Sequence, residues 1–330
     1  MVSEQKNRRS PRLKVLYIGN FSINSVGEPE IAWALEQLGH TVKQLPETGT
    51  TIADVKNELN RSRYDLLLFA KFRVGTSQEV REFLQQLRVG LYVRKTPSVC
   101  WLFDLYWGYR RENEIKMDML GAFAADVVFT TDGGHEAMWK RYRINHFLLR
   151  QGIDERVKVG KPVFPTKAEI GFIGSRLTWA GWPYRGQLID FLSATYGDRF
   201  GHFGDSSNGM KEVRHEELNN LFATLKIVLC DTVYSPHYWS NRIYETIGRG
   251  GFAIHPRVEG LSSEFKEFEH FIPYQLGNFK DLKNKIDFYL SEDKRRETIR
   301  KAGFDYCHQT HTYKNRVKEL LRMLEEQKVI

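Results

Sequence analysis

Residues 14–45, KVLYIGNFSINSVGEPEIAWALEQLGHTVKQL, hold in succession a strand, a loop, a helix and a second strand. The first apolar run, residues 14–18, is short and continuous, as in a buried strand. After a polar loop, Pro29 opens a helix with its apolar side chains on one face, and Gly39 closes it before the second strand begins at Thr41. Short apolar strands that alternate with amphipathic helices predict a parallel sheet covered on both faces.

The same alternation continues along the rest of the chain. It predicts further strands at residues 66–70, 98–103, 127–130 and 146–149, and a second series at residues 169–173, 199–203, 226–230 and 252–255. It predicts helices at residues 78–87, 185–194, 216–224 and 241–248, and a final amphipathic helix at residues 313–327. Between the two series, residues 150–167 carry two prolines, two glycines and scattered charges, which is typical of an interdomain linker.

We therefore expect an α/β protein with two Rossmann-like, doubly wound parallel-sheet domains that face a central cleft, and a C-terminal amphipathic helix. Ligands of open parallel sheets bind outside the carboxyl ends of the strands, so both domains would contribute to one site. The expected boundaries are a basic flexible tail at residues 1–13, an N-terminal domain at 14–150, a linker at 151–167 and a C-terminal domain at 168–330.

The composition is that of an ordinary folded protein. The chain has 330 residues, of which 41% are hydrophobic and 27% charged, enough for two domains. The longest apolar runs are too short to span a membrane, and the basic N-terminus has no apolar stretch behind it. Cys100, Cys230 and Cys307 are isolated, which predicts buried free thiols rather than disulfides. These features favour a cytoplasmic protein.

The net charge of +8 favours an anionic partner, but half of it lies at one end. Residues 1–14 hold five basic side chains and one acidic one, a net charge of +4. This segment is either a solvated leader or an electrostatic tether to nucleic acid or anionic lipid.

Several kinds of site are disfavoured by the motifs. No glycine-rich loop has the spacing of a dinucleotide-binding or P-loop fingerprint, and no Asp-x-Asp pair is present to hold a divalent ion on a diphosphate. The histidines do not pair at metal-ligand spacing with a third ligand. A site of this kind that binds phosphates without a metal needs Lys or Arg side chains and helix N-termini.

Residues 240–256, SNRIYETIGRGGFAIHP, offer such groups: a helix, a glycine-rich break and a strand. Ser240 is a good N-cap, and Asn241 follows it. Arg242 in the first turn is unfavourable with the helix dipole unless an anion is bound there. Glu245, one turn later, is placed to accept two ribose hydroxyls. The alternative from the residues alone is a surface helix whose Arg and Glu face water.

This segment resembles the donor-binding motif of group-1 GT-B glycosyltransferases, particularly the spore-maturation (CgeB-like) branch, with the pattern S-x-R-x-Y-E, a gap, Gly-Gly and a strand. The resemblance continues through residues 264–265, 271–274 and 303–312 and covers most of residues 165–320. It implies a GT-B fold, transfer from a nucleotide-diphosphate sugar, most simply a UDP-sugar, and no required metal.

The resemblance also implies roles for single residues. Glu245 matches the carboxylate that binds the donor ribose, and His237 stands where relatives carry a second carboxylate near the donor sugar. Arg185 is placed to bind the diphosphate, with Arg176 as a second candidate. Further donor-binding candidates come from loops at strand ends and before helices: Gly27, Gly174, Gly204, Asp205 and Arg214.

The N-terminal domain would then bind the acceptor. Residues 103–111, FDLYWGYRR, follow a predicted strand and combine aromatic rings with arginines, which suits a sugar or a base. Asp104 is the candidate general base, with His237 as the other catalytic candidate and Asp132 and His135 as secondary ones. Each of these residues also has a plain structural explanation, such as a turn or a helix cap.

The function expected is transfer of a sugar to an acceptor hydroxyl, with retention of anomeric configuration as the resemblance implies. The acceptor is either a glycan-type molecule or a hydroxylated, for example hydroxymethylated, base in DNA. DNA would be contacted through the basic tail and residues 103–111. A non-catalytic nucleotide-binding module and a sugar-nucleotide epimerase of the same fold stay open as alternatives.

Overall fold

The computed structural model describes residues 11–22, 27–70, 75–91, 95–104, 121–176, 183–204 and 212–330. Contacts divide the chain into two compact units, which are described separately here. One comprises residues 1–102, 116–129 and 317–330, and the other residues 103–115 and 130–316. Asp205 and residues 105–111 lie outside the described part, so their predicted roles have no structural account.

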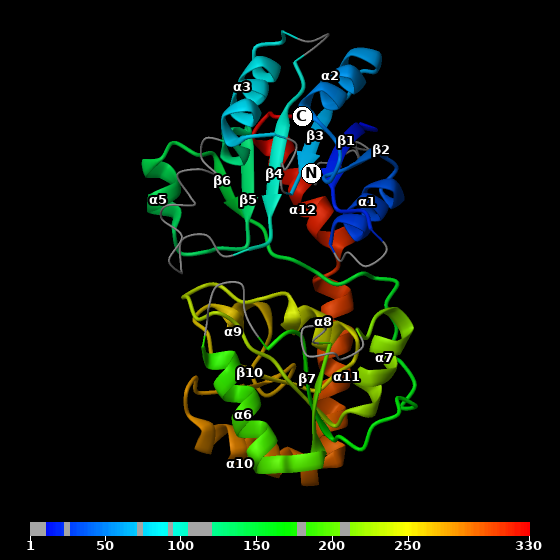
Figure 1. The fold of residues 1–330 in the computed structure, drawn as a ribbon, viewed down its shortest axis with the longest axis vertical. Helices are drawn as coiled ribbons and strands as arrows, with labels where there is room; N and C mark the ends of the chain where they lie inside the picture. The colour runs from blue at the N-terminus through cyan, green and yellow to red at the C-terminus, as the bar shows by residue number, and fades with distance from the viewer. Residues whose placement is uncertain are drawn as a thin grey trace, which may run out of the picture. The chain divides into compact units, whose positions relative to one another are not determined.

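The N-terminal sheet has six strands in the order β2-β1-β3-β4-β5-β6 (Figure 1). Its strands are β1 (Lys14–Gly19), β2 (Thr41–Pro46), β3 (Leu66–Phe69), β4 (Ser98–Leu102), β5 (Val127–Thr130) and β6 (His146–Leu148). The β1–β2, β1–β3 and β3–β4 pairs are parallel, as the alternation with helices requires. The associated helices are α1 (Glu28–Gln37), α2 (Ile52–Arg61), α3 (Ser77–Arg88), α5 (Glu136–Arg141) and the 3-10 turn Ala122–Ala124.

Local signals in the sequence start these helices. Pro29 lies in the first turn of α1, and the backbone N–H of Gly27 donates to Glu30 Oε2 over 2.6 Å. Thr51 and Thr76 cap α2 and α3 by accepting from the backbone N–H three residues later. The last helix, α12 (Tyr313–Glu326), belongs mostly to this unit, with Val317–Ile330 assigned to it.

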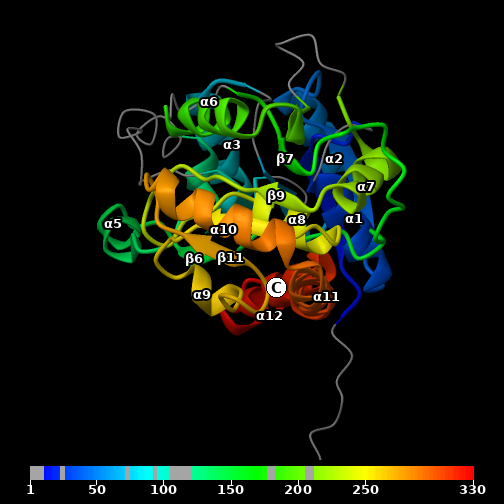
Figure 2. The same cartoon turned by 90° about the horizontal axis from the view of Figure 1, so that it is seen from below.

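The C-terminal sheet has five strands in the order β11-β10-β9-β7-β8, and its pairs are parallel. The strands are β7 (Ile170–Ile173), β8 (Phe200–Phe203), β9 (Ile227–Leu229), β10 (Ala253–Pro256) and β11 (Ile272–Tyr274). The helices are α6 (Tyr184–Tyr196), α7 (His215–Thr224), α8 (Arg242–Gly248), α9 (Leu261–Glu264), α10 (Phe279–Ser291) and α11 (Asp293–Thr310), with the 3-10 turn Gly197–Arg199. Figure 2 shows α6, α7 and α10 around the strands.

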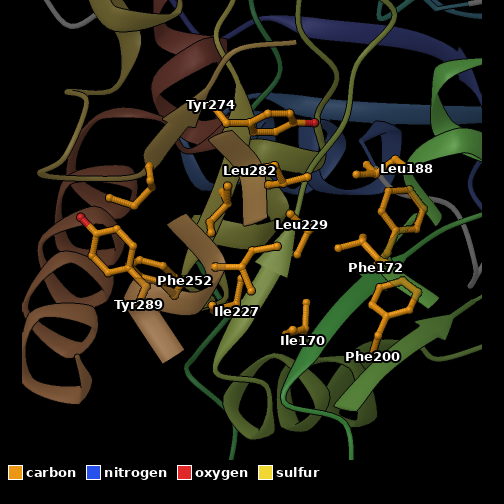
Figure 3. Close-up of a cluster of buried hydrophobic side chains, with 14 of the residues drawn as sticks. Ile170, Phe172, Leu188, Phe200, Ile227, Leu229, Phe252, Tyr274, Leu282 and Tyr289 are labelled. Atoms are coloured by element: carbon orange, nitrogen blue, oxygen red, sulfur yellow. The ribbon is translucent and has the colours of Figure 1, made fainter. Parts of the chain in front are cut away.

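Helices cover both faces of this sheet, because alternate strand residues need apolar partners on each side. On one face, Phe172 and Leu229 pack with Leu188 of α6 and Leu282 of α10 (Figure 3). On the other, side chains of α8 and α11 form a second buried cluster that includes Ile243, Tyr244, Ile247, Ala253 and Cys307. Because helices cover both faces of the sheet, a ligand can reach the sheet at the ends of its strands.

The predicted architecture of two Rossmann-like parallel-sheet domains with a C-terminal helix is confirmed. Residues 151–167 contain no helix or strand, and Ile153 forms a parallel bridge with Thr312. Five helices of the described residues were not predicted, namely α2, α5, α9, α10 and α11, and neither was strand β11. In α11 the charged and apolar residues are interspersed without a clear apolar stripe, so its helical period is weak in the sequence.

Candidate functional site

Two arginines meet one carboxylate at the carboxyl end of the second sheet. Asp231 lies two residues beyond β9 and is fully buried. Arg185, in the first turn of α6, places Nε 2.6 Å from Asp231 Oδ2. Arg242, the first residue of α8, places Nη1 2.6 Å from Asp231 Oδ1. Each oxygen of the carboxylate therefore accepts from a different guanidinium.

The end of β7 fixes both arginines further. Arg242 Nε donates to the Ile173 carbonyl over 3.1 Å, and Arg185 Nη1 donates to the Ser175 carbonyl over 3.0 Å. Both guanidinium carbons lie over the Phe172 ring, 5.1 Å away for Arg242 and 5.8 Å for Arg185. The two side chains are preorganised rather than free to follow a ligand.

Gly174 makes room for this arrangement. Its φ of +133° disfavours any side chain, and a Cβ at this position would lie 2.6 Å from Arg242 Nη2. A residue other than glycine would displace the guanidinium. The sequence analysis assigned Gly174 and Arg242 to the same donor site, but it did not show that Gly174 leaves room for the Arg242 guanidinium.

The charges around Asp231 do not cancel. Two guanidinium groups and one carboxylate leave one net positive charge in a half-buried setting. Burial, followed by repulsion from Arg242, lowers the pKa of Arg185, although Asp231 opposes that effect. Crowded cations that are partly removed from water favour an added anion, and a diphosphate matches their planar N–H groups.

Ser240 does not cap α8, so that prediction is wrong. Its hydroxyl donates to the Asp231 carbonyl over 3.1 Å, and its N–H donates to Thr232 Oγ1 over 3.2 Å. Asn241 occupies the N-cap position with helical backbone angles and no side-chain cap. The Ser240 side chain holds the turn that carries Asp231, so it does not cap α8.

Glu245 lies in the same helix but has a partner of its own. Its Oε2 accepts from Arg249 Nε over 2.7 Å, and Arg249 also contacts Asn219 of α7. Both side chains of the Glu245–Arg249 pair are mostly buried. A ribose at this carboxylate would share it with Arg249, and the ribose-binding role stays a prediction.

The remaining donor-site candidates either make other contacts or lie outside the part of the chain that the structure describes. Arg176 pairs with Asp190 of α6 at 2.6 Å, and Arg214 pairs with Glu212 at 3.2 Å. Gly204 directly follows β8 with a φ of +76°, as expected of a turn. Gly27 precedes α1 with a φ of +111°. None of these contacts decides a role in donor binding.

The catalytic candidates Asp104 and His237 have different surroundings. Asp104 is half-buried two residues beyond β4. His237 has a φ of +57°, an unusual backbone conformation for a residue other than glycine, and its Nε2 lies 3.3 Å from Glu259 Oε1. A Cβ on Gly134 or Gly260 would lie within 3 Å of the His237 ring, so two glycines make the slot that this imidazole occupies.

The sequence prediction missed Asp231, which organises the site. Its signal was present, because an acidic residue directly follows an apolar strand whose carboxyl end should face ligand. In the described ranges, no group of three His, Cys, Asp or Glu side chains is placed to hold a metal ion. Nor is any helix in those ranges long and apolar enough to cross a membrane.

Comparisons with known proteins agree with the fold. Residues 184–322, which include Arg185, Asp231 and Arg242, match a family described as "Glycosyl transferase-like". No protein among those with curated descriptions matches the sequence.

Solved structures of low sequence identity match nearly the whole chain. Alr3699/HepE from Anabaena, in complex with UDP-glucose, superposes with a TM-score of 0.66 at 14% identity, over 96% of this chain and 100% of that one. A glycosyltransferase from Rickettsia africae gives 0.65 at 13%, over 96% and 98%. Sucrose-phosphate synthase from Thermosynechococcus elongatus gives 0.67 at 13%, over 96% and 99%. The chain therefore has the GT-B fold, with a glycosyl transferase-like domain at residues 184–322.

Proposed function

We propose that this protein is a glycosyltransferase that moves a sugar from a UDP-sugar to an acceptor hydroxyl. The observation that carries the proposal is the pair of arginines on Asp231, which leaves a preorganised positive charge at the carboxyl end of the C-terminal sheet. A leaving nucleotide diphosphate develops negative charge where fixed N–H donors stabilise it best. The family match over residues 184–322 and the UDP-glucose complex of HepE support a sugar-nucleotide donor.

In this proposal, Arg185 and Arg242 replace a metal ion on the diphosphate, and Glu245 binds the ribose. His237 contacts the donor sugar where relatives of the spore-maturation branch use a carboxylate. The anomeric configuration is retained. The contact of His237 with the donor sugar and the retention of configuration rest on the resemblance of residues 240–256 to the donor-binding motif of that branch. The assignment to the branch rests on the same resemblance.

Donor binding is tested by the thermal shift of the whole chain with UDP, UDP-glucose, UDP-galactose and UDP-N-acetylglucosamine. A ligand that binds only the folded state raises the melting temperature in proportion to its binding free energy. We expect Arg185→Ala and Arg242→Ala to weaken the best donor by at least about tenfold, since each removes a charge-assisted hydrogen bond of about 1.5–3 kcal/mol. Glu245→Ala should weaken UDP-sugars and UDP alike.

Arg199→Ala is the matched control. Arg199 precedes β8 and pairs with Glu169 at the amino end of the same sheet, where its side chain is 54% exposed. Donor affinity should be unchanged in this variant. Equal donor shifts in Arg185→Ala and the wild type would contradict the site assignment. Nucleotide binding with no transfer or hydrolysis of any donor would favour the non-catalytic module, and interconversion of UDP-glucose and its epimer would favour an epimerase.

The acceptor is proposed to be a glycan-type hydroxyl or a hydroxymethylated base in DNA. The net charge of +8, half of it in residues 1–14, supports the DNA acceptor. A DNA acceptor predicts retention on DNA that weakens with salt and on deletion of residues 1–13. Absence of binding at low salt would exclude DNA and leave the glycan.

A further inference from the structure

An aspartate and a histidine form a second polar pair, separate from the two arginines. Asp132 follows β5 and is fully buried, and its Oδ1 lies 3.4 Å from His135 Nε2. His135 occupies the N-cap position of α5 without capping it, so its ring turns back towards the carboxylate instead. The His135 side chain remains 24% exposed, while its Nε2 atom is buried against Asp132. The exposed part of the ring therefore belongs to its other atoms.

Buried neighbours hold Asp132 in place. Its N–H donates to Thr130 Oγ1 over 3.3 Å, and the Thr130 hydroxyl lies 2.7 Å from His146 Nε2. Burial lowers the pKa of His146 to about 3, so that ring is neutral at physiological pH. Arg150 donates to the Thr131 carbonyl and stacks 3.8 Å from the Trp239 ring centroid. The backbone of the turn that carries Asp132 is thus held on both sides.

One loop connects this pair to the arginine site. Residues 231–241 begin at Asp231 and end just before Arg242, and His237 lies between them. The Gly133 N–H donates to the His237 carbonyl over 3.3 Å, and a Cβ on Gly134 would lie 2.9 Å from His237 Cδ2. Gly133 and Gly134 are the two residues between Asp132 and His135. The Asp–His pair therefore adjoins the loop that carries Asp231.

We infer that His135, oriented by Asp132, is the general base that takes the proton of the acceptor hydroxyl. The inference rests on the proposed function and adds the acceptor side of the reaction. The acceptor O–H bond breaks and its proton moves to Nδ1, the ring nitrogen that does not face Asp132. The acceptor oxygen bonds to the anomeric carbon on the face from which the diphosphate departs, and the bond from that carbon to the diphosphate oxygen breaks. Its electron pair leaves with UDP, next to Arg185 and Arg242, and His135 becomes a cation paired with Asp132.

The charges around His135 suit a base that works near neutral pH. The interaction with Asp132 raises the pKa of His135, burial opposes the effect, and Glu136 of α5 adds to it. The neutral His146 of β6, the ring of His237 on the neighbouring loop and the Arg150 guanidinium, which is attracted by Asp132, also face this turn. A base with a pKa near the working pH combines availability with proton affinity. A separation of 3.4 Å is long for a hydrogen bond, but such contacts commonly tighten when substrate binds.

The test is the pH dependence of UDP release from the UDP-sugar that gives the largest thermal shift, with water as the acceptor. For the wild type we expect kcat/KM to rise with pH through the pKa of His135. His135→Gln should lower kcat by about 100-fold or more, as loss of a general base does, and abolish that rise. Donor affinity from the thermal shift should stay within about twofold, because Arg185 and Arg242 are untouched.

Asp132 is a positioning residue, and Asp132→Asn separates that role from a purely structural one. Loss of the carboxylate lowers the pKa of His135, so the rise in kcat/KM should move to lower pH as kcat falls. A structural role would lower kcat without moving the profile. His215→Asn, at the exposed first residue of α7, whose φ is positive, is the control and should keep the wild-type profile.

Each outcome separates this inference from the proposed function. If the wild type binds and cleaves a donor and His135→Gln keeps its turnover or its pH profile, the inference is overturned and the proposed function stands. If His135→Gln loses donor affinity in parallel with kcat, His135 is part of the donor site and the inference is likewise overturned. A wild type that neither binds nor cleaves any of the donors overturns both.

Discussion

Arg242 donates to Asp231 over 2.6 Å while the other oxygen of that carboxylate accepts from Arg185, so one buried aspartate orders two cations. Arg242 is 11 residues from Asp231 in the sequence and Arg185 is 46 residues from it. The two arginines repel each other and are held together by the charge between them. The width of the Asp231 carboxylate thus sets the distance between the two guanidinium groups, and this distance also suits a diphosphate.

Replacing this carboxylate should destabilise the fold as well as the site. Asp231→Asn keeps the volume but leaves two mostly buried guanidinium groups without their counter-charge. Removing one partner of a buried ion pair costs about 3–5 kcal/mol, and the partial exposure of both arginines places the expected loss at the lower end. Urea denaturation measures it. Asp305→Asn, in the exposed pair with Lys301, should change the unfolding free energy by less than about 1 kcal/mol.

If the donor phosphate then serves as the counter-charge of the two arginines, Asp231→Asn should bind the donor more tightly although its fold is less stable. A fall in affinity with unchanged stability would contradict the view that Asp231 orders the arginines.

The glycine slot around His237 gives a prediction with a built-in control. In Gly260→Ala the new Cβ would lie 2.6 Å from His237 Nδ1, at a φ of +87°. Gly277 has a φ of +79° and nothing within 4 Å of the corresponding Cβ position. Both substitutions carry the same backbone strain, about 1–2 kcal/mol. Only Gly260→Ala should displace His237 and reduce turnover of the UDP-sugar by more than the stability loss explains.

Equal turnover in the two alanine variants, measured well below their melting temperatures, would show that the position of the His237 ring does not matter to the reaction.

Acidification should weaken the fold through His311. Its Nδ1 accepts from Arg316 and its Nε2 donates to the Glu264 carbonyl, which needs the neutral ring. Burial lowers the pKa of His311 to about 4, whereas the unfolded chain takes up this proton near 6.5. The unfolded state therefore binds more protons between pH 4 and 6.5. The free energy of unfolding decreases as the pH is lowered through that window, by up to about 1.4 kcal/mol per pH unit.

The measurement is the urea midpoint as a function of pH. His255, whose pKa burial lowers to about 4, contributes with the same sign. His311→Gln, which keeps a side-chain N–H donor, should be less stable at neutral pH but show a shallower loss between pH 6.5 and 4. An unchanged slope in this variant would assign the acid sensitivity to other groups.

The three cysteines should resist alkylation while the protein is folded. Cys100, Cys230 and Cys307 are all free and fully buried. Burial raises the pKa of Cys230 to about 12 and raises that of Cys307 as well, so little thiolate is present at neutral pH. Native protein should react with a thiol reagent only at the rate of unfolding, and denatured protein should show three reactive thiols. Fast loss of a thiol in the native state would contradict this burial.

The sequence by itself determined the order and type of most elements. Apolar runs of strand length and prolines and glycines at helix ends act over a few residues, so they are visible without the fold. Helices such as α11 were missed because their burial comes from two neighbours at once, which leaves no single apolar stripe. Residues 240–256 were identified as a candidate donor site for the same local reason, through a motif read along one helix and strand.

Only the tertiary structure decided which charges meet. Asp231 orders two arginines because the parallel strands bring the ends of β7 and β9 to one edge of the sheet, where α6 and α8 each supply an arginine. The same packing diverts Ser240 from capping to holding the Asp231 turn, and turns His135 towards Asp132. Local patterns encode backbone conformation, but the partner of a buried charge is fixed by chain crossovers and by the cost of leaving that charge unpaired away from water.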